Sequence, residues 1–542
     1  MGRLLKTKLM GHQRKGASLF LKHKSVAFFW EPGTGKTLGV LAAIVRLASK
    51  GSIKRILVAG PKTARTVWSR QLIEHVRIDR IPIYALIDPS ASQINAIKND
   101  DITLISVSHR RLSAILDTFG DDYFDMIVID ESQRIKKHNT QQSKVAYELG
   151  KYAEYKCILS GTPLDKSELD LWAQYRFLDD SIFGHNWFKF IKRYCHQIDI
   201  GHTRIPKLKN AYKKWIIDQV KHITMAVKRR DVLDLPPVVD GIIDFELRGK
   251  AKKAYKQMEE EFLIEFGDHT STSEMTVTAM LRLQQLTGGF FKTDDDDTIQ
   301  LEQDKLNAFL DHFEDMPDQK VVIFAQYTAE IDILHEAILR FTTVEILDGR
   351  TKDRTIWETF QDEHDPRVII VQTQMGVGID LFKASLAYFY SGSFSYIDYR
   401  QCRDRLDRKG QLNKILFIHL LAQFTIDMHR YNVLKIKGDL ADHVFNQLKK
   451  GKTMAKKEKA AKGEKKAKGK SNLPEFVKPK YGIPELAEEL GVEPSVCRQK
   501  LRAGGYEKEG RAWDFGSAKE MKNTAKDLAS KTKKKKKDED DD

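Results

Sequence analysis

Short runs of apolar residues recur in two parts of this chain, and amphipathic stretches of helical length separate them. In the first part the runs occupy 26–29, 56–59, 102–105 and 126–129, and in the second 321–324, 368–371 and 415–418. Strands that are apolar throughout are typical of parallel sheets that helices cover on both faces. The pattern therefore predicts an α/β fold with two parallel-sheet lobes.

The composition is that of a globular protein. A chain of 542 residues should form about two to four domains. The hydrophobic share is 41% and the charged share 31%, and no apolar run approaches the roughly 20 residues that cross a bilayer. No apolar stretch after Met1 would serve as a secretory signal, so we expect no membrane contact and no export. The four cysteines form no Cys-x-x-Cys pair, which argues against structural zinc and disulfides.

The formal net charge of +15 suits a polyanionic partner without identifying one. Residues 449–470 hold eleven lysines and two glutamates, a local charge of +9, which leaves +6 for the rest of the chain. We interpret this stretch as a polar tether that adds nonspecific affinity for a polyanion.

A glycine-rich loop joins the first apolar run to a helical stretch. Its expected phosphate-binding residues are Gly33, Thr34, Gly35, Lys36 and Thr37. The glycines let backbone N–H groups point at phosphate oxygens, Lys36 adds a cation, and the Thr37 hydroxyl can ligate magnesium. The alternative is a fortuitous glycine-rich turn, which the flanking strand and helix disfavour.

Two carboxylates, Asp130 and Glu131, follow the apolar run 126–129. They emerge at the carboxyl end of a buried strand, where α/β sheets bind ligands. We expect Asp130 to hold magnesium and Glu131 to orient and deprotonate an attacking water. A bare Asp-Glu pair is common, so its position after a buried strand and beyond the glycine-rich loop carries the prediction.

The order of motifs resembles that of a superfamily-two helicase. The series comprises Gln13, 31–37, 61–63 with Trp68, 130–133, 160–164, 323–327, 376–380 and 401–411. Within that superfamily, residues 161–164 followed by 168–172, and 228–232 leading to 235–237, resemble the Swi/Snf family of DNA-translocating ATPases. The similarity covers about residues 5–440 and is that of a minimal bacterial or viral type.

The resemblance implies two RecA-like lobes with helical insertions, and the composition after residue 448 predicts a linker, a small C-terminal module and a charged tail. The expected parts are an ATP-binding RecA-like lobe 1–164; helical insertions and the inter-lobe connection 165–300; a second RecA-like lobe 301–448; a Lys-rich linker 449–472; a helix-turn-helix-like module 473–516; and a disordered charged tail 517–542.

The resemblance also implies nucleotide contacts outside the loop. Gln13 would recognise adenine and so favour ATP, although an isolated glutamine is more often a surface residue. Gln133 would sense the γ-phosphate across the cleft. Gly378 would permit close backbone approach to phosphates, and Asp380 would contact the ribose, at a position where the family more often has Asn.

Further residues match motifs that couple hydrolysis to nucleic acid. Ser160 and Thr162 match the coupling motif, with an ordinary β-turn as the alternative reading. Gln372 and Thr373 are expected to share in this coupling and in DNA contact.

The second lobe would supply arginines to the nucleotide. Arg405 and Arg408 match the family's finger arginines, which reach the γ-phosphate when the lobes close. A guanidinium stays charged and offers a planar fork to the developing phosphoryl charge. The alternative is a solvated basic helix face, and Arg403 receives no role.

A compact stretch near the C-terminus resembles a helix-turn-helix. A proline lies near the start of each expected helix and a glycine at the turn between them. Arg498, Lys500 and Arg502 on the second helix would contact DNA. The alternative is a small helical module that binds a protein partner or packs on itself.

These features together predict a DNA-dependent ATPase that uses ATP and Mg²⁺ to translocate on duplex or branched DNA as a monomer. A strand-separating or annealing helicase at forks or recombination intermediates is a second hypothesis, and a nucleotide-gated DNA-binding scaffold is a third. We expect a cytoplasmic location, at the nucleoid or in a host cell, while a lysine-rich stretch can also imitate a nuclear signal.

Overall fold

The structure is a computed structural model of residues 1–542. It describes residues 4–460, with the exceptions of 63, 91, 94, 95, 99, 166, 201, 202, 268–272, 294, 296, 315–318, 354, 377 and 378, and also residues 523–524. The chain divides into two compact units, Met1–Lys459 and Ala460–Asp542. The predicted helix-turn-helix-like module, with Arg498, Lys500 and Arg502, lies outside the described residues. The first unit contains two lobes, each built on a parallel sheet.

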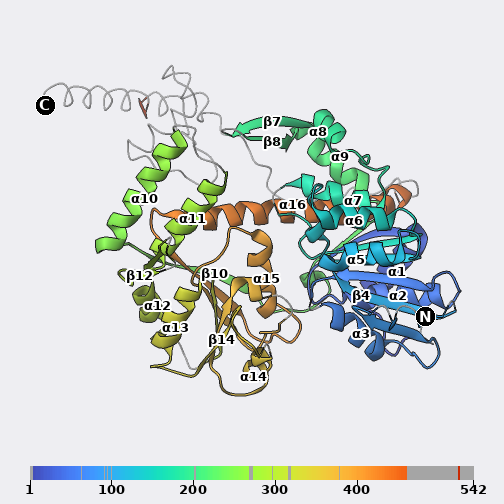
Figure 1. The fold of residues 1–542 in the computed structure, drawn as a ribbon, viewed down its shortest axis with the longest axis horizontal. Coiled ribbons are helices and arrows are strands. Elements are labelled where there is room, and N and C mark those ends of the chain that lie inside the picture. Colours follow the sequence, from blue (N-terminus) through green and yellow to red (C-terminus); the bar gives the residue numbers. More distant parts are fainter. Residues whose placement is uncertain are drawn as a thin grey trace. The chain divides into compact units, whose positions relative to one another are not determined.

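Lobe 1, drawn mainly in blue and cyan in Figure 1, is built on a seven-stranded sheet. The strand order is β3-β4-β2-β5-β6-β1-β9, and every pairing is parallel. Its strands are β1 Ser25–Trp30, β2 Arg55–Gly60, β3 Ile83–Ile87, β4 Ile102–Ser108, β5 Met126–Asp130, β6 Tyr155–Leu159 and β9 Thr224–Val227. Its helices are α1 Gly11–His23, α2 Lys36–Ala48, α3 Ala64–His75, α5 Leu112–Phe119, α6 Gln141–Gly150 and α7 Leu171–Leu178.

Alternate residues of β1 enter different hydrophobic cores. Phe28 and Trp30 pack with α1 and α2, whereas Phe29 packs against Tyr175 of α7 on the other face. Successive side chains of a strand point to opposite faces, so a strand buried on both faces must be apolar throughout. This explains why the apolar runs predicted the sheet.

Lobe 2 holds a six-stranded sheet in the order β10-β17-β16-β13-β15-β14, again parallel throughout. Its strands are β10 Val238–Phe245, β13 Val321–Ala325, β14 Val344–Leu347, β15 Val368–Gln372, β16 Leu386–Phe389 and β17 Ile415–Ala422. Its helices are α12 Asp304–Glu314, α13 Thr328–Ile338, α14 Ile356–Asp362 and α15 Tyr396–Leu406. The predicted fold of two parallel-sheet lobes is therefore confirmed.

Several further helices and strands are inserted along the chain between β6 of lobe 1 and β13 of lobe 2. They are α8 Trp187–Tyr194, the antiparallel pair β7 Cys195–Ile200 and β8 Thr203–Leu208, α9 Asn210–Val220, α10 Gly249–Gly267, α11 Ser273–Thr287, and the antiparallel pair β11 Phe290–Lys292 and β12 Thr298–Gln300. The structure thus adds strands to the stretch 165–300, where the sequence predicts helical insertions. β9 and β10 are edge strands of the two sheets. β9 has only four residues, and most residues of β10 are exposed or half-buried, so neither strand has a long apolar run.

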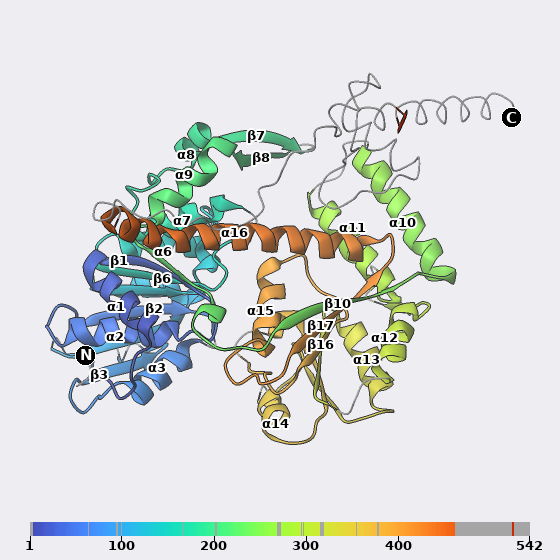
Figure 2. The ribbon, with the colours of Figure 1, turned by 180° about the vertical axis from the view of Figure 1, so that it is seen from behind.

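Helix α16, Ile426–Ala460, contacts both lobes (Figure 2). Ile426, at its start, packs with Phe245 and Tyr255 beside lobe 2. Further along, Val444 and Phe445 belong to a core of lobe 1. No helix among the described residues is long and apolar enough to cross a membrane.

Candidate active site

The sheet order brings the lobe 1 motifs together. Strands β5, β6 and β1 are neighbours, and their carboxyl ends lead into Glu131, Ser160 and Glu31 respectively. Ligands of parallel sheets bind at this edge. The glycine-rich loop, the acidic pair and the coupling motif therefore adjoin.

The loop between β1 and α2 has the backbone of a phosphate site. Gly33 has a φ of 82° and Gly35 a φ of 74°, a region that favours glycine. The Thr34 hydroxyl donates to the Glu31 carbonyl at 2.8 Å, and the Lys36 ammonium donates to the Trp30 carbonyl at 2.8 Å. Lys36 and Thr37 begin α2, so a positive helix terminus and a lysine converge on the loop.

Gln13 of α1 is buried against this loop. Its Nε2 donates to the Gly35 carbonyl at 3.2 Å, and its Oε1 accepts from the Met10 N–H at 2.8 Å. A Cβ on Gly35 would stand 2.3 Å from Gln13 Nε2, so a side chain there would displace the amide. The structure places Gln13 at the nucleotide loop and not on an open surface.

The acidic pair, Asp130 and Glu131, lies at the carboxyl end of β5, at the same edge of the sheet as the loop. Asp130 Oδ2 accepts from Trp68 Nε1 at 3.0 Å, and Oδ1 accepts from the Glu131 N–H at 3.0 Å. Burial, and then the charge of Glu131, raise the pKa of Asp130 to about 6, against the opposing charge of Lys36. Glu131 has a left-handed φ of 51°, an uncommon conformation for a residue with a side chain.

A buried hydrogen-bond relay leads from the acidic pair to the coupling motif. Gln133 Nε2 donates to Glu131 Oε2 at 2.6 Å, and the Ser160 hydroxyl donates to Gln133 Oε1 at 2.7 Å. The Thr162 N–H then donates to Ser160 Oγ at 2.9 Å. Gln133 thus contacts Glu131 directly, and Ser160 and Thr162 are connected to Glu131 through Gln133.

In lobe 2, Gln372 and Thr373 lie at the end of β15 and contact Gln326. Gln372 Nε2 donates to the Gln326 carbonyl at 3.2 Å, and the Thr373 hydroxyl donates to Gln326 Oε1 at 2.5 Å. These contacts hold the ends of β15 and β13 together. Gly378 lies outside the described residues.

The two predicted finger arginines lie at the end of α15, next to lobe 1. A Cβ built on Gly33 would lie 3.9 Å from the Cβ of Arg408. The phosphate loop is therefore adjacent to residues 404–408, which we call the finger segment. Arg405 is buried and donates to the Gln401 and Ile379 carbonyls, and Arg408 forms an ion pair with Asp380. These arginines do not form a solvated basic helix face.

Charges from both lobes act on Arg405. Burial lowers the pKa of Arg405, while the carboxylates of Asp404 and Glu131 oppose that shift. Glu131 is a lobe 1 residue, so its charge reaches the finger helix across the interface.

Arg403, to which the sequence analysis assigns no role, contacts residues of its own lobe. Its Nη2 donates to Asp240 Oδ2 at 3.0 Å and its Nη1 to the Tyr399 hydroxyl at 2.9 Å, and its guanidinium lies 4.2 Å from the Phe417 ring centre. These contacts attach α15 to β10 and β17 and turn Arg403 away from the nucleotide loop.

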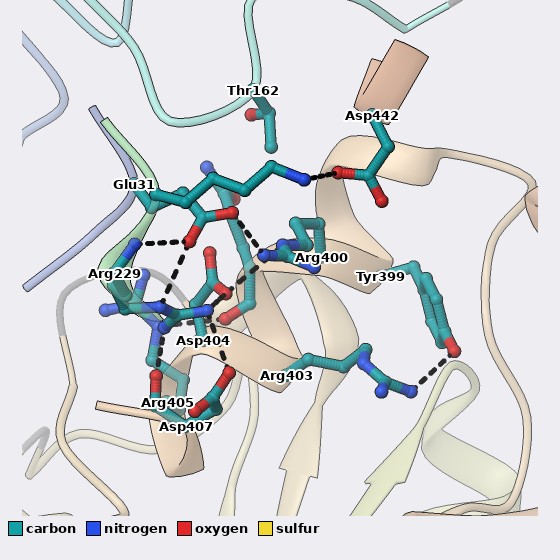
Figure 3. A network of polar contacts seen from close by, with 12 residues as sticks. Glu31, Thr162, Arg229, Tyr399, Arg400, Arg403, Asp404, Arg405, Asp407 and Asp442 are labelled. Carbon is teal, nitrogen blue, oxygen red and sulfur yellow. Dashed lines mark hydrogen bonds and ion pairs between the residues drawn. The ribbon is translucent and has the colours of Figure 1, made fainter. Parts of the chain in front are cut away.

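Sequence reasoning missed a charge network between the lobes. Figure 3 shows Arg229 between Glu31 of the phosphate loop and Asp404 of α15. Arg400 joins the same two acids, with Nη2 at 2.9 Å from Glu31 Oε1 and Nε at 3.3 Å from Asp404 Oδ1. Burial would raise the pKa of Asp404, but the charges of Arg229, Arg400 and Arg405 outweigh it and lower that pKa below its ordinary range.

One signal for this network was available in the sequence. Asp404 and Asp407 each directly precede a predicted finger arginine, so an acid accompanies each of the two arginines. The partner, Arg229, lies far away in the sequence, and nothing local indicates that it meets them.

A second cleft of about 620 Å³ lies between the lobes and is lined by residues of both. Lobe 1 contributes the exposed cations Lys62, Arg110 and Arg134, and lobe 2 contributes Gln374 and Met375. Three cations along an open cleft make it attractive to a chain of phosphates.

A phosphate loop and acidic pair in one parallel-sheet lobe, faced by arginines of another, define a DNA-dependent ATPase of helicase superfamily two. Residues 12–288 match the SNF2-related domain, and residues 304–410 match the helicase conserved C-terminal domain. The chain belongs to the SNF2-related family.

Several proteins of this kind are similar to the chain. Protein p41 of Acyrthosiphon pisum secondary endosymbiont phage 1 is 24% identical over 75% of this chain and 92% of its own length. A Caenorhabditis elegans homolog of SWI/SNF-related matrix-associated actin-dependent regulator of chromatin subfamily A-like protein 1 is 24% identical over 81% of this chain and 62% of its own length. The human DNA annealing helicase and endonuclease ZRANB3 is 24% identical over 82% of this chain, which spans only 41% of that protein.

Among solved structures, the Sulfolobus solfataricus SWI2/SNF2 ATPase core in complex with dsDNA is similar. The likeness covers 82% of this chain and 97% of that one, with 20% sequence identity and a TM-score of 0.40.

Proposed function

We propose that the chain is an ATP-driven translocase on double-stranded DNA. The observation that carries this proposal is the relay from Glu131 through Gln133 and Ser160 to Thr162, with the finger segment opposite. A movement of the Ser160 turn on DNA would be passed to the Glu131 carboxylate by two short hydrogen bonds. Hydrolysis would then depend on DNA, and opening and closing of the lobes would advance the protein along the duplex.

Each side chain at the cleft has a proposed part in hydrolysis. Glu131 would orient and deprotonate the attacking water, and Gln133 would hold the carboxylate in place. Arg405 and Arg408 would stabilise the charge that develops on the γ-phosphate. Gln13, already at the loop, would bind adenine, and Asp380 would contact the ribose.

The residues present fit a magnesium nucleotide. Burial first, and then the charge of Glu131, raise the pKa of Asp130, and the charge of Lys36 opposes them. A divalent cation held by Asp130 and the Thr37 hydroxyl would stabilise the ionised carboxylate. When bound, the ion would neutralise charge on the β- and γ-phosphates.

The basic cleft is the proposed path of one DNA strand. Lys62, Arg110 and Arg134 would contact phosphates without reading bases, which suits sequence-independent movement. Gln374 and its neighbours Gln372 and Thr373 lie on the lobe 2 side, so both lobes could grip the same strand.

Steady-state ATPase rates with duplex, single-stranded and forked DNA test the proposal. We expect duplex DNA to raise the rate, and this stimulation to fall in Arg110→Ala and with rising salt. Lys50→Ala, at an exposed lysine just beyond the end of α2, is the matched control. A rate that no DNA changes would contradict the proposal and favour the nucleotide-gated scaffold.

A strand-separating or annealing helicase is the second candidate, because ZRANB3 carries the name of an annealing helicase. Displacement of a third strand from a triplex, measured beside unwinding of a plain fork, separates the two. Triplex displacement without unwinding supports the translocase. Efficient fork unwinding without triplex displacement supports the helicase.

The C-terminal module at 473–516 is a further proposal from sequence. Deletion of residues 473–542 should leave DNA-stimulated ATPase largely intact and change DNA affinity. Complete loss of activity would show that this segment belongs to the ATPase itself.

A further inference from the structure

Arg229 occupies the short link between the sheets of the two lobes. It begins the 3-10 turn Arg229–Asp231, which lies between β9 of lobe 1 and β10 of lobe 2. Its side chain is 1% exposed. A buried arginine needs carboxylate partners, and this one has three.

Two of these carboxylates belong to the finger segment. Arg229 Nη2 lies 2.6 Å from Asp404 Oδ1 and 3.1 Å from Asp407 Oδ2, and Nη1 donates to the Asp407 carbonyl. Asp404 directly precedes Arg405, and Asp407 directly precedes Arg408. One guanidinium therefore binds the residue next to each finger, which fixes both the rotation and the position of the end of α15 (Figure 3).

The third carboxylate is Glu31, in the phosphate loop. Its Oε2 accepts from the Arg229 N–H at 2.8 Å and lies 3.6 Å from Arg229 Nε. A Cβ built on Gly33 would lie 3.9 Å from Arg229 Cδ, so the stem of Arg229 also borders the loop. The backbone and side chain of Arg229 thus connect the phosphate loop to the finger segment.

We propose that Arg229 is a positioning residue for ATP hydrolysis, which sets the finger arginines against the phosphate loop by binding Glu31, Asp404 and Asp407 at once. Its guanidinium is engaged by carboxylates, so it acts through Arg405 and Arg408. The proposal rests on the finger role given to those two arginines under the proposed function.

The physical argument for positioning is geometric. A buried cluster of charges adds little net stability, because the cost of removing the ions from water offsets their attraction. A planar fork with several donors does fix the relative orientation of its partners, which an ammonium cannot do equally well. Misplacement of a catalytic group by about 1 Å can lower a rate by about a hundredfold.

Arg229→Lys is the first test, because it keeps the charge and loses the fork. We expect kcat for ATP to fall by about a hundredfold, while the KM for ATP and the melting temperature change little. Arg340→Lys is the matched control. Arg340 is an exposed arginine that follows α13 in lobe 2, so the kcat of this variant should stay at the wild-type value.

A second variant keeps the proposal testable if Arg229→Lys does not fold. Asp407→Asn removes one partner at a less buried position and should also lower kcat without a change in the KM for ATP. In the double variant Arg229→Lys/Asp407→Asn the two losses should not multiply, because both act through the same contact.

Three outcomes would overturn the proposal. They are an unchanged kcat in both single variants, a loss of ATP binding equal to the loss of rate, or independent effects in the double variant. Rates are measured with and without duplex DNA. A wild-type enzyme that DNA does not stimulate would contradict the translocase and leave the comparison between variants valid.

Discussion

Arg408 forms an ion pair with Asp380, so the outer finger arginine is held by a carboxylate of its own lobe. Under the proposed function, the γ-phosphate competes with that carboxylate for the guanidinium. Asp380 is the proposed ribose contact, and the two roles predict opposite effects of its removal.

Asp380→Asn is expected to lower the KM for ATP, because it releases Arg408. The pair is partly exposed, and such pairs contribute up to about 1 kcal/mol, so the change should be at most about fivefold. The KM of the Asp380→Asn variant is measured with ATP and with dATP. A KM that rises for ATP and not for dATP would instead identify Asp380 as a ribose contact.

Lys36→Ala should abolish ATP turnover and weaken nucleotide binding, because Lys36 supplies the cation of the phosphate loop. Steady-state ATPase and titration with a fluorescent ATP analogue measure the two effects. Lys50→Ala, beyond the end of the same helix, should match the wild type. An active Lys36→Ala enzyme would remove the loop from the proposed chemistry.

Glu131→Gln should still bind ATP and remain on DNA in its closed form, with hydrolysis reduced by about 10² to 10⁴-fold. The amide keeps the size of the side chain but cannot accept the proton of water. Nucleotide binding, DNA retention and single-turnover hydrolysis are measured on one preparation. Normal hydrolysis would assign the base elsewhere.

Arg405→Ala and Arg408→Ala should retain DNA binding and each lose about 10³-fold or more in hydrolysis. Arg403→Ala is the control from the same helix, since Arg403 binds Asp240 and Tyr399 within lobe 2. Equal losses in all three variants would indicate a structural role for the helix, and not two fingers.

The buried His419 of β17 should make folding sensitive to acid. Burial lowers the pKa of His419 to about 4, despite an opposing hydrogen bond to Asp240. Between pH 6.5 and 4 the unfolded chain therefore binds a proton that the folded chain does not, and stability falls as the pH falls. Above pH 6.5 this contribution is constant.

The size of that effect can be measured by urea unfolding at pH 7 and pH 5. Relative to wild type, His419→Gln should lose about 2 kcal/mol less of its unfolding free energy between the two values. Arg403, Arg430, Tyr399 and Tyr431 also surround the imidazole, so the comparison is one of slopes and not of absolute stability. Equal slopes would show that His419 is charged in the folded protein.

The local signals in the sequence predicted the sheets and the loop well. An apolar run such as 126–129 of β5 must be covered on both faces, and that requirement is visible in the residues themselves. The glycines of the phosphate loop and the acids after β5 likewise follow from local backbone chemistry.

Long-range partners were beyond the reach of sequence patterns. Arg229 meets Asp404 only through the packing of the link between the sheets against the end of α15, and no local pattern marks either residue for the other. Ser160 and Thr162 were predicted from motif order, but the relay through Gln133 depends on β5 and β6 being neighbours in the sheet. The ion pair of Arg408 with Asp380 likewise had no local signal.

The most direct test of the account is the steady-state ATPase rate of the full chain with and without duplex DNA, in wild type and in Ser160→Ala. The wild-type rate should rise on addition of DNA, and Ser160→Ala, which breaks the relay to Glu131, should lose most of that rise while still binding DNA. A wild-type rate that DNA leaves unchanged, or full stimulation without the Ser160 hydroxyl, would contradict coupling through this relay.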